Sequence, residues 1–257
     1  MEAIRSRKEM KKQYGTDANL VSRISIHDKY SVNRKGFGNW LFEQYEFFEG
    51  CRILELGCGT GGLWKKRTLP EGAELILTDF SAGMLQSARE NLAGMENVTF
   101  RQADIQDIPY PDGGFDTVIA NMMLYHVPDR NRGIAEVRRV LKSGGIFACA
   151  TSGENGIAEF VRELFADSHS IAPVKVPFTL QNGAELLKRH FSHVEIRRYE
   201  DHLEVTEPSD LVRYIRTLGA MADFSSVTDE EMLDTFERHM ENGVLTVPKE
   251  YGTFLAK

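Results

Sequence analysis

Residues 53–62 read Ile53-Leu54-Glu55-Leu56-Gly57-Cys58-Gly59-Thr60-Gly61-Gly62. A short apolar run is followed directly by a turn that is rich in glycine. Glycine has no Cβ, so it adopts positive φ angles and lets a ligand approach the backbone closely. A strand that ends in such a turn and leads into a helix is a common cofactor cradle in α/β proteins. The stretch therefore predicts an α/β fold with a cofactor site at its centre.

Two kinds of cofactor fit the glycine spacing. Gly57, Gly59 and Gly62 satisfy the loose dinucleotide pattern. Asp79 follows about twenty residues on, where a ribose-binding acid is expected. Glu55, however, lies two residues before the first glycine, and its negative charge would oppose a nearby diphosphate. A cationic ligand fits better, and S-adenosylmethionine carries both a sulfonium and an ammonium.

The segment 55–61 resembles the first motif of class I S-adenosylmethionine-dependent methyltransferases, in particular small-molecule methyltransferases with a type 11 or type 25 domain. Residues 79–85 are close to the family's D-x-S-x-x-M-L pattern, and 141–145 resemble its LKPGG segment, with Ser143 in place of proline. The resemblance covers residues 45–150 well. It implies a Rossmann-like, seven-stranded, mostly parallel sheet with an antiparallel last strand and helices on both faces.

The composition is that of an ordinary globular protein of 257 residues. Lys and Arg total 31 against 38 for Asp and Glu, a net charge of −7, so no basic footprint for nucleic acid is expected. The three cysteines include no C-x-x-C pair, which argues against a disulfide framework and a zinc site, and no clustered ligands suggest another metal. Without a leader or an apolar run of about eighteen residues, we expect no membrane contact and a cytoplasmic location.

The polar residues that follow successive predicted strands are the candidate site. Strands are predicted over 51–56, 73–79, 97–102 and 115–120. Ligands of open α/β sheets bind beyond the carboxyl ends of the strands. The resemblance implies that Asp79 accepts the ribose hydroxyls, Met84 packs on the adenine and Asp104 accepts the adenine amino group. The residues assigned to the cofactor are Glu55, Gly57, Cys58, Gly59, Asp79, Phe80, Met84, Asp104, Ile105, Asn121 and Arg23.

The methyl-transfer end of the site has three catalytic candidates, His126, Tyr30 and Asn121. Asn121 follows the fourth strand and could hold the methionine part of the cofactor or the substrate. His126 could act as a general base, because an imidazole titrates near physiological pH, or it could only pack and position. In the resembling family the segment before the first strand often forms a lid. The lid residues that could line the pocket are Tyr14, Arg23, Tyr30 and Asn33. An arginine can hold a carboxylate by paired hydrogen bonds.

The rest of the chain is predicted by periodicity. Helices are expected over 40–48, 61–67, 81–91, 130–141, 156–168, 182–191, 208–219 and 228–241. Further strands are expected over 145–151, 193–200 and 244–256, with a turn near 249–252. The glycines of 142–145 are expected to cap the helix before them. Arg132, Arg138 and Arg139 lie mostly off the apolar stripe of their helix and are expected to be solvated.

These expectations combine into one domain organisation. Residues 1–44 would form a lid and 45–257 the methyltransferase domain, with a core over 45–151 and a helical cap over about 205–243. The expected function is methyl transfer to a small-molecule acceptor in a monomer or homodimer. Two alternatives stay open: a lyase or cyclase that uses the same cofactor without methylating, and a non-catalytic module that only binds it. Acceptor specificity would lie in the lid and the cap, which match no motif.

Overall fold

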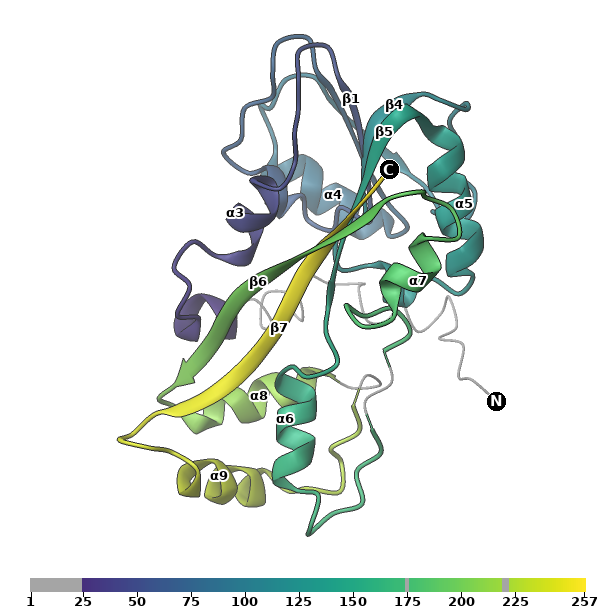
Figure 1. The fold of residues 1–257 in the computed structure, drawn as a ribbon. Helices are drawn as coiled ribbons and strands as arrows, with labels where there is room; N and C mark the ends of the chain where they lie inside the picture. The colour runs from purple at the N-terminus through teal and green to yellow at the C-terminus, as the bar shows by residue number, and fades with distance from the viewer. Residues whose placement is uncertain (1–24, 174–175, 219–221) are drawn as a thin grey trace.

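A seven-stranded sheet forms the centre of the computed structural model, which describes residues 25–173, 176–218 and 222–257 (Figure 1). The strand order is β3-β2-β1-β4-β5-β7-β6. The first five strands pair in parallel, whereas β7 runs antiparallel to both β5 and β6. The predicted Rossmann-like sheet with an antiparallel last strand is thereby confirmed. The strands are β1 Arg52–Leu56, β2 Glu74–Asp79, β3 Val98–Gln102, β4 Phe115–Ile119, β5 Leu141–Ser152, β6 Val194–Val205 and β7 Leu245–Ala256.

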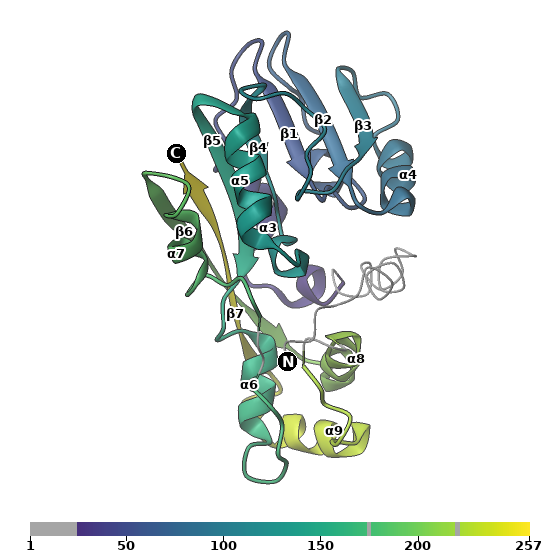
Figure 2. The same cartoon turned by 90° about the vertical axis from the view of Figure 1, so that its right-hand side faces the viewer.

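Helices cover both faces of the sheet (Figures 1 and 2). The helices are α3 Phe37–Phe42, α4 Ala82–Asn91, α5 Arg130–Val140, α6 Ile157–Leu164, α7 Gly183–Leu187, α8 Pro208–Leu218 and α9 Asp229–Arg238; the 3₁₀ turns are η1 Gly62–Trp64 and η2 Leu124–His126. Side chains fix where the two central helices begin. The Ser81 hydroxyl accepts the Met84 N–H at 3.3 Å, and the Asp129 carboxylate accepts the Arg132 N–H at 2.9 Å. Such caps satisfy amide donors that the first helical turn leaves free.

The alternation of side chains along the strands divides the core into two layers. In β1, Leu54 and Leu56 pack with Ile134 and Val137 of α5 on one face. Ile53 packs on the other face, in the cluster that holds Leu85 and Ala88 of α4. Because successive strand residues point to opposite faces, a strand covered on both sides reads as a continuous apolar run. This explains why β1, β2 and β4 are recognisable in the sequence, whereas β3 lies at the sheet edge and is mostly exposed.

The last two strands run past the rest of the sheet and carry a third core. The β6–β7 ladder joins twelve residues of each strand, but β5 pairs with β7 only between Phe147↔Ala256 and Ser152↔Tyr251. Residues 200–205 and 245–250 therefore extend beyond β5, where α6, α8 and α9 pack around them (Figures 1 and 2). We call these two strand segments with the three helices the arm.

Residues 25–33 are fastened to the arm. Residues 25–30 are helical, and Ser31 forms an isolated antiparallel bridge with Leu203 of β6. The Val32 N–H donates to the His202 carbonyl at 3.1 Å, and the Asn33 side chain donates to the Glu200 carbonyl at 3.0 Å. The segment that precedes β1 is thus held by strands from the far end of the chain.

Several predicted bounds are wrong, each for a local reason. The helix expected over 61–67 is only the short turn η1, because Gly61 and Lys66 adopt positive φ angles of 73° and 62°. The helix expected over 40–48 ends at Phe42. Residue 141 is already extended, so the glycines of 142–145 do not cap α5 but lie where the β4–β5 register shifts. The predicted turn near 249–252 is absent, because β7 is paired continuously with β6.

Neither a membrane helix nor a ready metal site is found in the described part of the chain. No helix there combines the length and the apolar character needed to cross a bilayer. Within residues 25–173, 176–218 and 222–257, no three His, Cys, Asp or Glu side chains come together as a metal-binding group. Cys51, Cys58 and Cys149 are free and buried.

Candidate functional site

A cavity of about 1190 Å³ lies beyond the carboxyl ends of β1, β2, β3 and β4. Its walls come from the glycine turn, the residues after these strands, residues 27–41 and the arm. Pockets for one small ligand typically measure about 300–1,000 Å³. The cavity therefore has room for two ligands side by side. Its position is the one expected for ligands of an open α/β sheet.

The glycine turn forms one wall of the cavity and is crowded on its inner side. Gly57 has a φ of 73°, and a Cβ there would lie 3.0 Å from Cγ of Met123. Both the backbone angle and the crowding exclude a larger side chain. The Cys58 N–H donates to the Thr78 carbonyl at 2.9 Å, which ties the turn to β2. The turn is thus held in shape before any ligand arrives.

Glu55 lies at the base of the turn and is buried. Its Oε2 accepts a 2.5 Å hydrogen bond from the Trp64 indole N–H, and the Trp64 ring packs against Phe42 and Phe47. Burial raises the pKa of Glu55 to about 7, against the effect of the Trp64 hydrogen bond; the Asp79 charge raises it further. A cation entering the cavity near this carboxyl would favour its ionised form. Glu55 is therefore poised to change its charge when a cationic ligand binds.

Asp79 ends β2 and connects the turn to α4. Its Oδ2 accepts the Gly59 N–H at 2.9 Å, and its Oδ1 accepts the Ser81 N–H at 2.8 Å. Burial raises the pKa of the carboxyl, and these amide hydrogen bonds oppose that effect. Each carboxylate oxygen can accept a second hydrogen bond. Asp79 therefore keeps acceptor capacity for a hydroxyl group of a ligand while it holds the loop.

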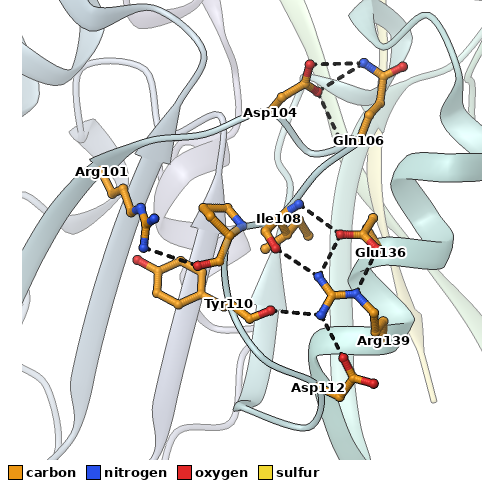
Figure 3. Close-up of polar contacts among 9 residues, drawn as sticks. Arg101, Asp104, Gln106, Ile108, Tyr110, Asp112, Glu136 and Arg139 are labelled. Carbon is orange, nitrogen blue, oxygen red and sulfur yellow. Dashed lines mark hydrogen bonds and ion pairs between the residues drawn. The ribbon is translucent and has the colours of Figure 1, made fainter.

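The remaining residues predicted for the cofactor also line the cavity. They are Cys58, Phe80, Met84, Asp104, Ile105 and Asn121. Met84 and Ile105 are buried, so they offer an apolar surface. The Asp104 Oδ1 accepts both the backbone and the side-chain N–H of Gln106, at 2.9 and 3.0 Å (Figure 3). The structure thus brings these residues together at one end of the cavity.

Arg139 of α5 braces the loop that follows Asp104, contrary to the expectation that it is solvated. Its guanidinium donates to the carbonyls of Ile108 and Tyr110 at 2.9 and 2.8 Å (Figure 3). Glu136 orients the guanidinium through bonds of 2.7 and 2.8 Å, and its Oε2 accepts the Ile108 N–H at 2.9 Å. The position of Arg139 off the apolar stripe of α5 did not predict this role, because its partners are carbonyl groups of the loop after Asp104.

Two donors in the cavity wall have no partner among the described residues. The Asn121 Oδ1 accepts a 3.0 Å bond from the Tyr45 hydroxyl, whereas its buried Nδ2 has no hydrogen-bond partner. The Arg67 guanidinium lies 4.4 Å from the Phe42 ring centre and donates to Asn39, but its buried Nε has no partner. Buried polar atoms normally find partners, so both atoms mark places where a ligand acceptor group fits. Arg67 belongs to no motif, so its place in the site was not predicted from the sequence.

The lid and catalytic candidates are divided between different places. His126 lines the cavity from η2, with its ring centre 4.4 Å from that of Tyr125. Asn33 also lines the cavity. Tyr30 is not in the cavity wall: its ring belongs to the arm core, and its hydroxyl donates to Asp210 Oδ2 at 2.6 Å. Tyr14 and Arg23 lie outside the described residues.

Comparison with known proteins locates the recognisable part of the chain. Residues 54–149 match the family model described as a methyltransferase domain. A ubiquinone/menaquinone biosynthesis C-methyltransferase of Pectobacterium carotovorum is 39% identical over 99 residues, which is 37% of this chain and 39% of that protein. The chain thus matches only about two fifths of the length of this curated relative.

Two solved structures show how far the fold extends. The YcgJ protein of Bacillus subtilis is 21% identical with a TM-score of 0.58, and the match covers 85% of this chain and 96% of that one. The [4+2]-cyclase SpnF is 18% identical with a TM-score of 0.61, covering 97% of this chain and 96% of that one. At these identities the likeness concerns the fold alone.

Proposed function

We propose that the chain uses the methyltransferase domain matched over residues 54–149 to bind S-adenosylmethionine and to methylate a small molecule. The observation that carries the proposal is the arrangement of Asp79, which holds the glycine turn by Gly59 and lines the cavity at the end of β2. Such a carboxylate suits the ribose hydroxyls of a nucleoside. The adenine would lie against Met84 and Ile105, near Asp104.

The donors without partners support a place for the other end of the cofactor. Asn121 Nδ2 and Arg67 Nε both belong to residues of the cavity wall, and a carboxylate satisfies such donors well. The amino-acid end of S-adenosylmethionine carries a carboxylate and an ammonium. We assign the carboxylate to Arg67 or Asn121 and the neighbourhood of the ammonium to Glu55. Arg23 remains a candidate for the same carboxylate.

The chemistry proposed for this site is displacement at the methyl group. When bound, S-adenosylmethionine supplies an activated methyl group on a good leaving group. The residues of this chain need to align the acceptor and exclude water, and such positioning contributes about 7–11 kcal/mol in well-oriented systems. His126 lines the cavity and is a candidate for taking a proton from the acceptor or for orienting it. The match to the ubiquinone/menaquinone biosynthesis C-methyltransferase covers only 39% of that protein, so its name does not identify the acceptor here.

We also propose that the arm and the segment before β1 form the acceptor side. Tyr214 and Leu218 of α8 line the cavity together with residues 27–39. We keep the proposal of a lid over residues 1–44, of which 1–24 lie outside the described residues, and of a helical cap over about 205–243. Acceptor specificity would then depend on residues outside the matched range of 54–149.

Thermal denaturation with candidate ligands tests the proposal. We expect S-adenosylhomocysteine to raise the melting temperature and NAD to leave it unchanged, because a ligand that binds only the folded state stabilises it. The D79A variant should lose most of this stabilisation, and D107N, a nearby exposed carboxylate, should keep it. Stabilisation by NAD alone would contradict the proposal. Mass spectrometry of the products, S-adenosylhomocysteine or methylthioadenosine, separates methyl transfer from a lyase or cyclase reaction.

A further inference from the structure

A cluster of polar and aromatic side chains closes the cavity on the arm side. Its members are His27 and Ser31, Asp201 of β6, Tyr214 of α8, and Lys249 and Tyr251 of β7. All except Asp201 line the cavity. Four separate segments of the chain supply these residues, and residues 54–149 supply none of them. The cluster is therefore a feature that the match to the methyltransferase domain does not explain.

A buried ion pair anchors the cluster. Lys249 Nζ contacts Asp201 Oδ2, and the two side chains have relative exposures of only 2% and 0%. Lys249 also donates to the Ser31 hydroxyl at 2.7 Å, and its Nζ lies 5.5 Å from the ring centres of Tyr199 and Tyr251. Asp201 accepts the Asn33 N–H at 3.0 Å. A buried pair with this many contacts is a fixed charge arrangement, not a surface ion pair.

His27 is held beside this pair as a neutral imidazole. Its ring meets the rings of Tyr214 and Tyr251 edge-on, with both centre distances 5.7 Å. Burial lowers the pKa of His27 to about 3, and the Lys249 charge lowers it further, more than Asp201 raises it. At physiological pH the ring therefore carries one N–H donor and one nitrogen acceptor.

One nitrogen of this ring lacks a partner. Nε2 lies 3.4 Å from the Tyr251 hydroxyl, whereas Nδ1 is buried without a hydrogen-bond partner in the described structure. Buried polar atoms rarely stay unpaired in a native complex. His27 lines the same cavity as Asn121, so a ligand bound in this cavity is a candidate partner for Nδ1.

We propose that His27 forms the hydrogen bond to the methyl acceptor, and that the acceptor presents an uncharged hydroxyl group on an aromatic or apolar body. This inference rests on the proposed function. Tyr214 and Tyr251 fix the plane of the imidazole, and Lys249 with Asp201 keeps it neutral. A protonated amine is a poor occupant, because the Lys249 ammonium lines the cavity while its counter-charge, Asp201, does not. An aromatic or apolar body fits the rings beside His27.

Binding of two matched probes tests this contact. 2-Naphthol carries an uncharged hydroxyl, and 2-naphthylmethylamine carries an ammonium on the same ring system. Binding is measured by calorimetry with and without saturating S-adenosylhomocysteine. We expect 2-naphthol to bind more tightly than the ammonium probe. The H27F variant should weaken 2-naphthol binding by about fivefold, as expected for one lost hydrogen bond. H27N should stay within about twofold of the wild type, because its amide replaces Nδ1.

Two controls separate the contact from a general loss of structure. H190F changes an equivalent side chain outside the cavity and should leave 2-naphthol binding unchanged. If H27F unfolds, the ¹⁵N resonance of the His27 ring, assigned by its absence in H27N, gives a second measurement. A shift of this resonance on addition of 2-naphthol supports the contact.

Three results overturn the inference: no binding of 2-naphthol to the wild type, equal binding to H27F, or tighter binding of the ammonium probe. Failure of S-adenosylhomocysteine to stabilise any of these proteins overturns the proposed function instead. In that case the naphthol measurements without S-adenosylhomocysteine still decide whether His27 contacts a hydroxyl ligand. The two proposals therefore fail by different observations.

Discussion

The two sides of the cavity are built in different ways. On the side of β1–β4, polar side chains hold the backbone of nearby loops, as Asp79 holds Gly59 and Arg139 holds the carbonyls after Asp104. On the arm side, side chains hold one another across segments far apart in sequence, as Lys249 holds Asp201 and Ser31. The first arrangement preforms a cradle for a constant ligand. The second joins segments from both ends of the chain without any loop motif.

The largest effect is expected on the arm side, from the K249M variant. Removing the ammonium leaves the Asp201 carboxylate buried without its counter-charge, which costs about 3–5 kcal/mol of the free energy of unfolding. Urea denaturation measures this loss. The double variant K249M/D201L should recover part of it, because no charge is then left buried. Equal stability of K249M and the wild type would show that the ion pair of Lys249 with Asp201 does not stabilise the arm side of the cavity.

Next in size is a pH effect on the cofactor side, tested with E55Q. Because the pKa of Glu55 is raised from 4.5 to about 7, the folded protein binds more protons than the unfolded chain within this window. The free energy of unfolding therefore falls as pH rises from 4.5 to 7, by about 3 kcal/mol from this group. Urea denaturation at several pH values should show this decrease in the wild type and its absence in E55Q.

The same group links pH to cofactor binding. If a cation enters near Glu55, binding ionises the carboxyl, so the affinity for S-adenosylhomocysteine should rise as pH increases through 7. E55Q should lose this dependence, and E74Q, an exposed glutamate of β2, should keep it. Calorimetry in buffers of different ionisation enthalpy measures the released proton. An identical pH dependence in E55Q would assign the titration to another group.

A smaller effect is expected from G57A in the glycine turn. The positive φ and the contact with Met123 together should cost about 2 kcal/mol of stability. Gly50 is a matched control, because its φ is 71° and a Cβ there meets nothing within 4 Å. The difference between G57A and G50A in thermal denaturation therefore isolates the crowding. No difference would show that Met123 moves away freely.

The smallest effect is expected from R139A. The loss of the bonds to the loop carbonyls should cost about 1 kcal/mol and weaken S-adenosylhomocysteine binding about fivefold, because the loop carrying Asp104 loosens. R138A changes an exposed arginine of the same helix and should bind like the wild type. Calorimetric titration compares the two. Equal affinities for R139A and R138A would show that the brace is not needed to position Asp104.

The difference between the two sides of the cavity also explains which features could be predicted from the sequence. The strands β1, β2 and β4 are largely buried, and β1–β4 are followed by short motifs, so their positions and the residues Glu55, Asp79 and Asp104 are recognisable locally. Arg139 and Arg67 could not be found in this way, because their roles depend on carbonyls and rings that only the fold brings near. Likewise, a turn was predicted within β7, because residues 249–252 carry no local sequence signal of their pairing with β6.

The position of β7 has a consequence for the order in which the sheet assembles. Within the sheet, β6 is joined to the other strands only through β7, although β6 comes earlier in the chain. When β6 leaves the ribosome, it therefore has no neighbour in the sheet to pair with. Its pairing must wait for residues 245–256, and such contacts between distant segments form slowly. The arm is thus expected to be the last part of the molecule to become native, after the glycine turn and the strands around it have already formed.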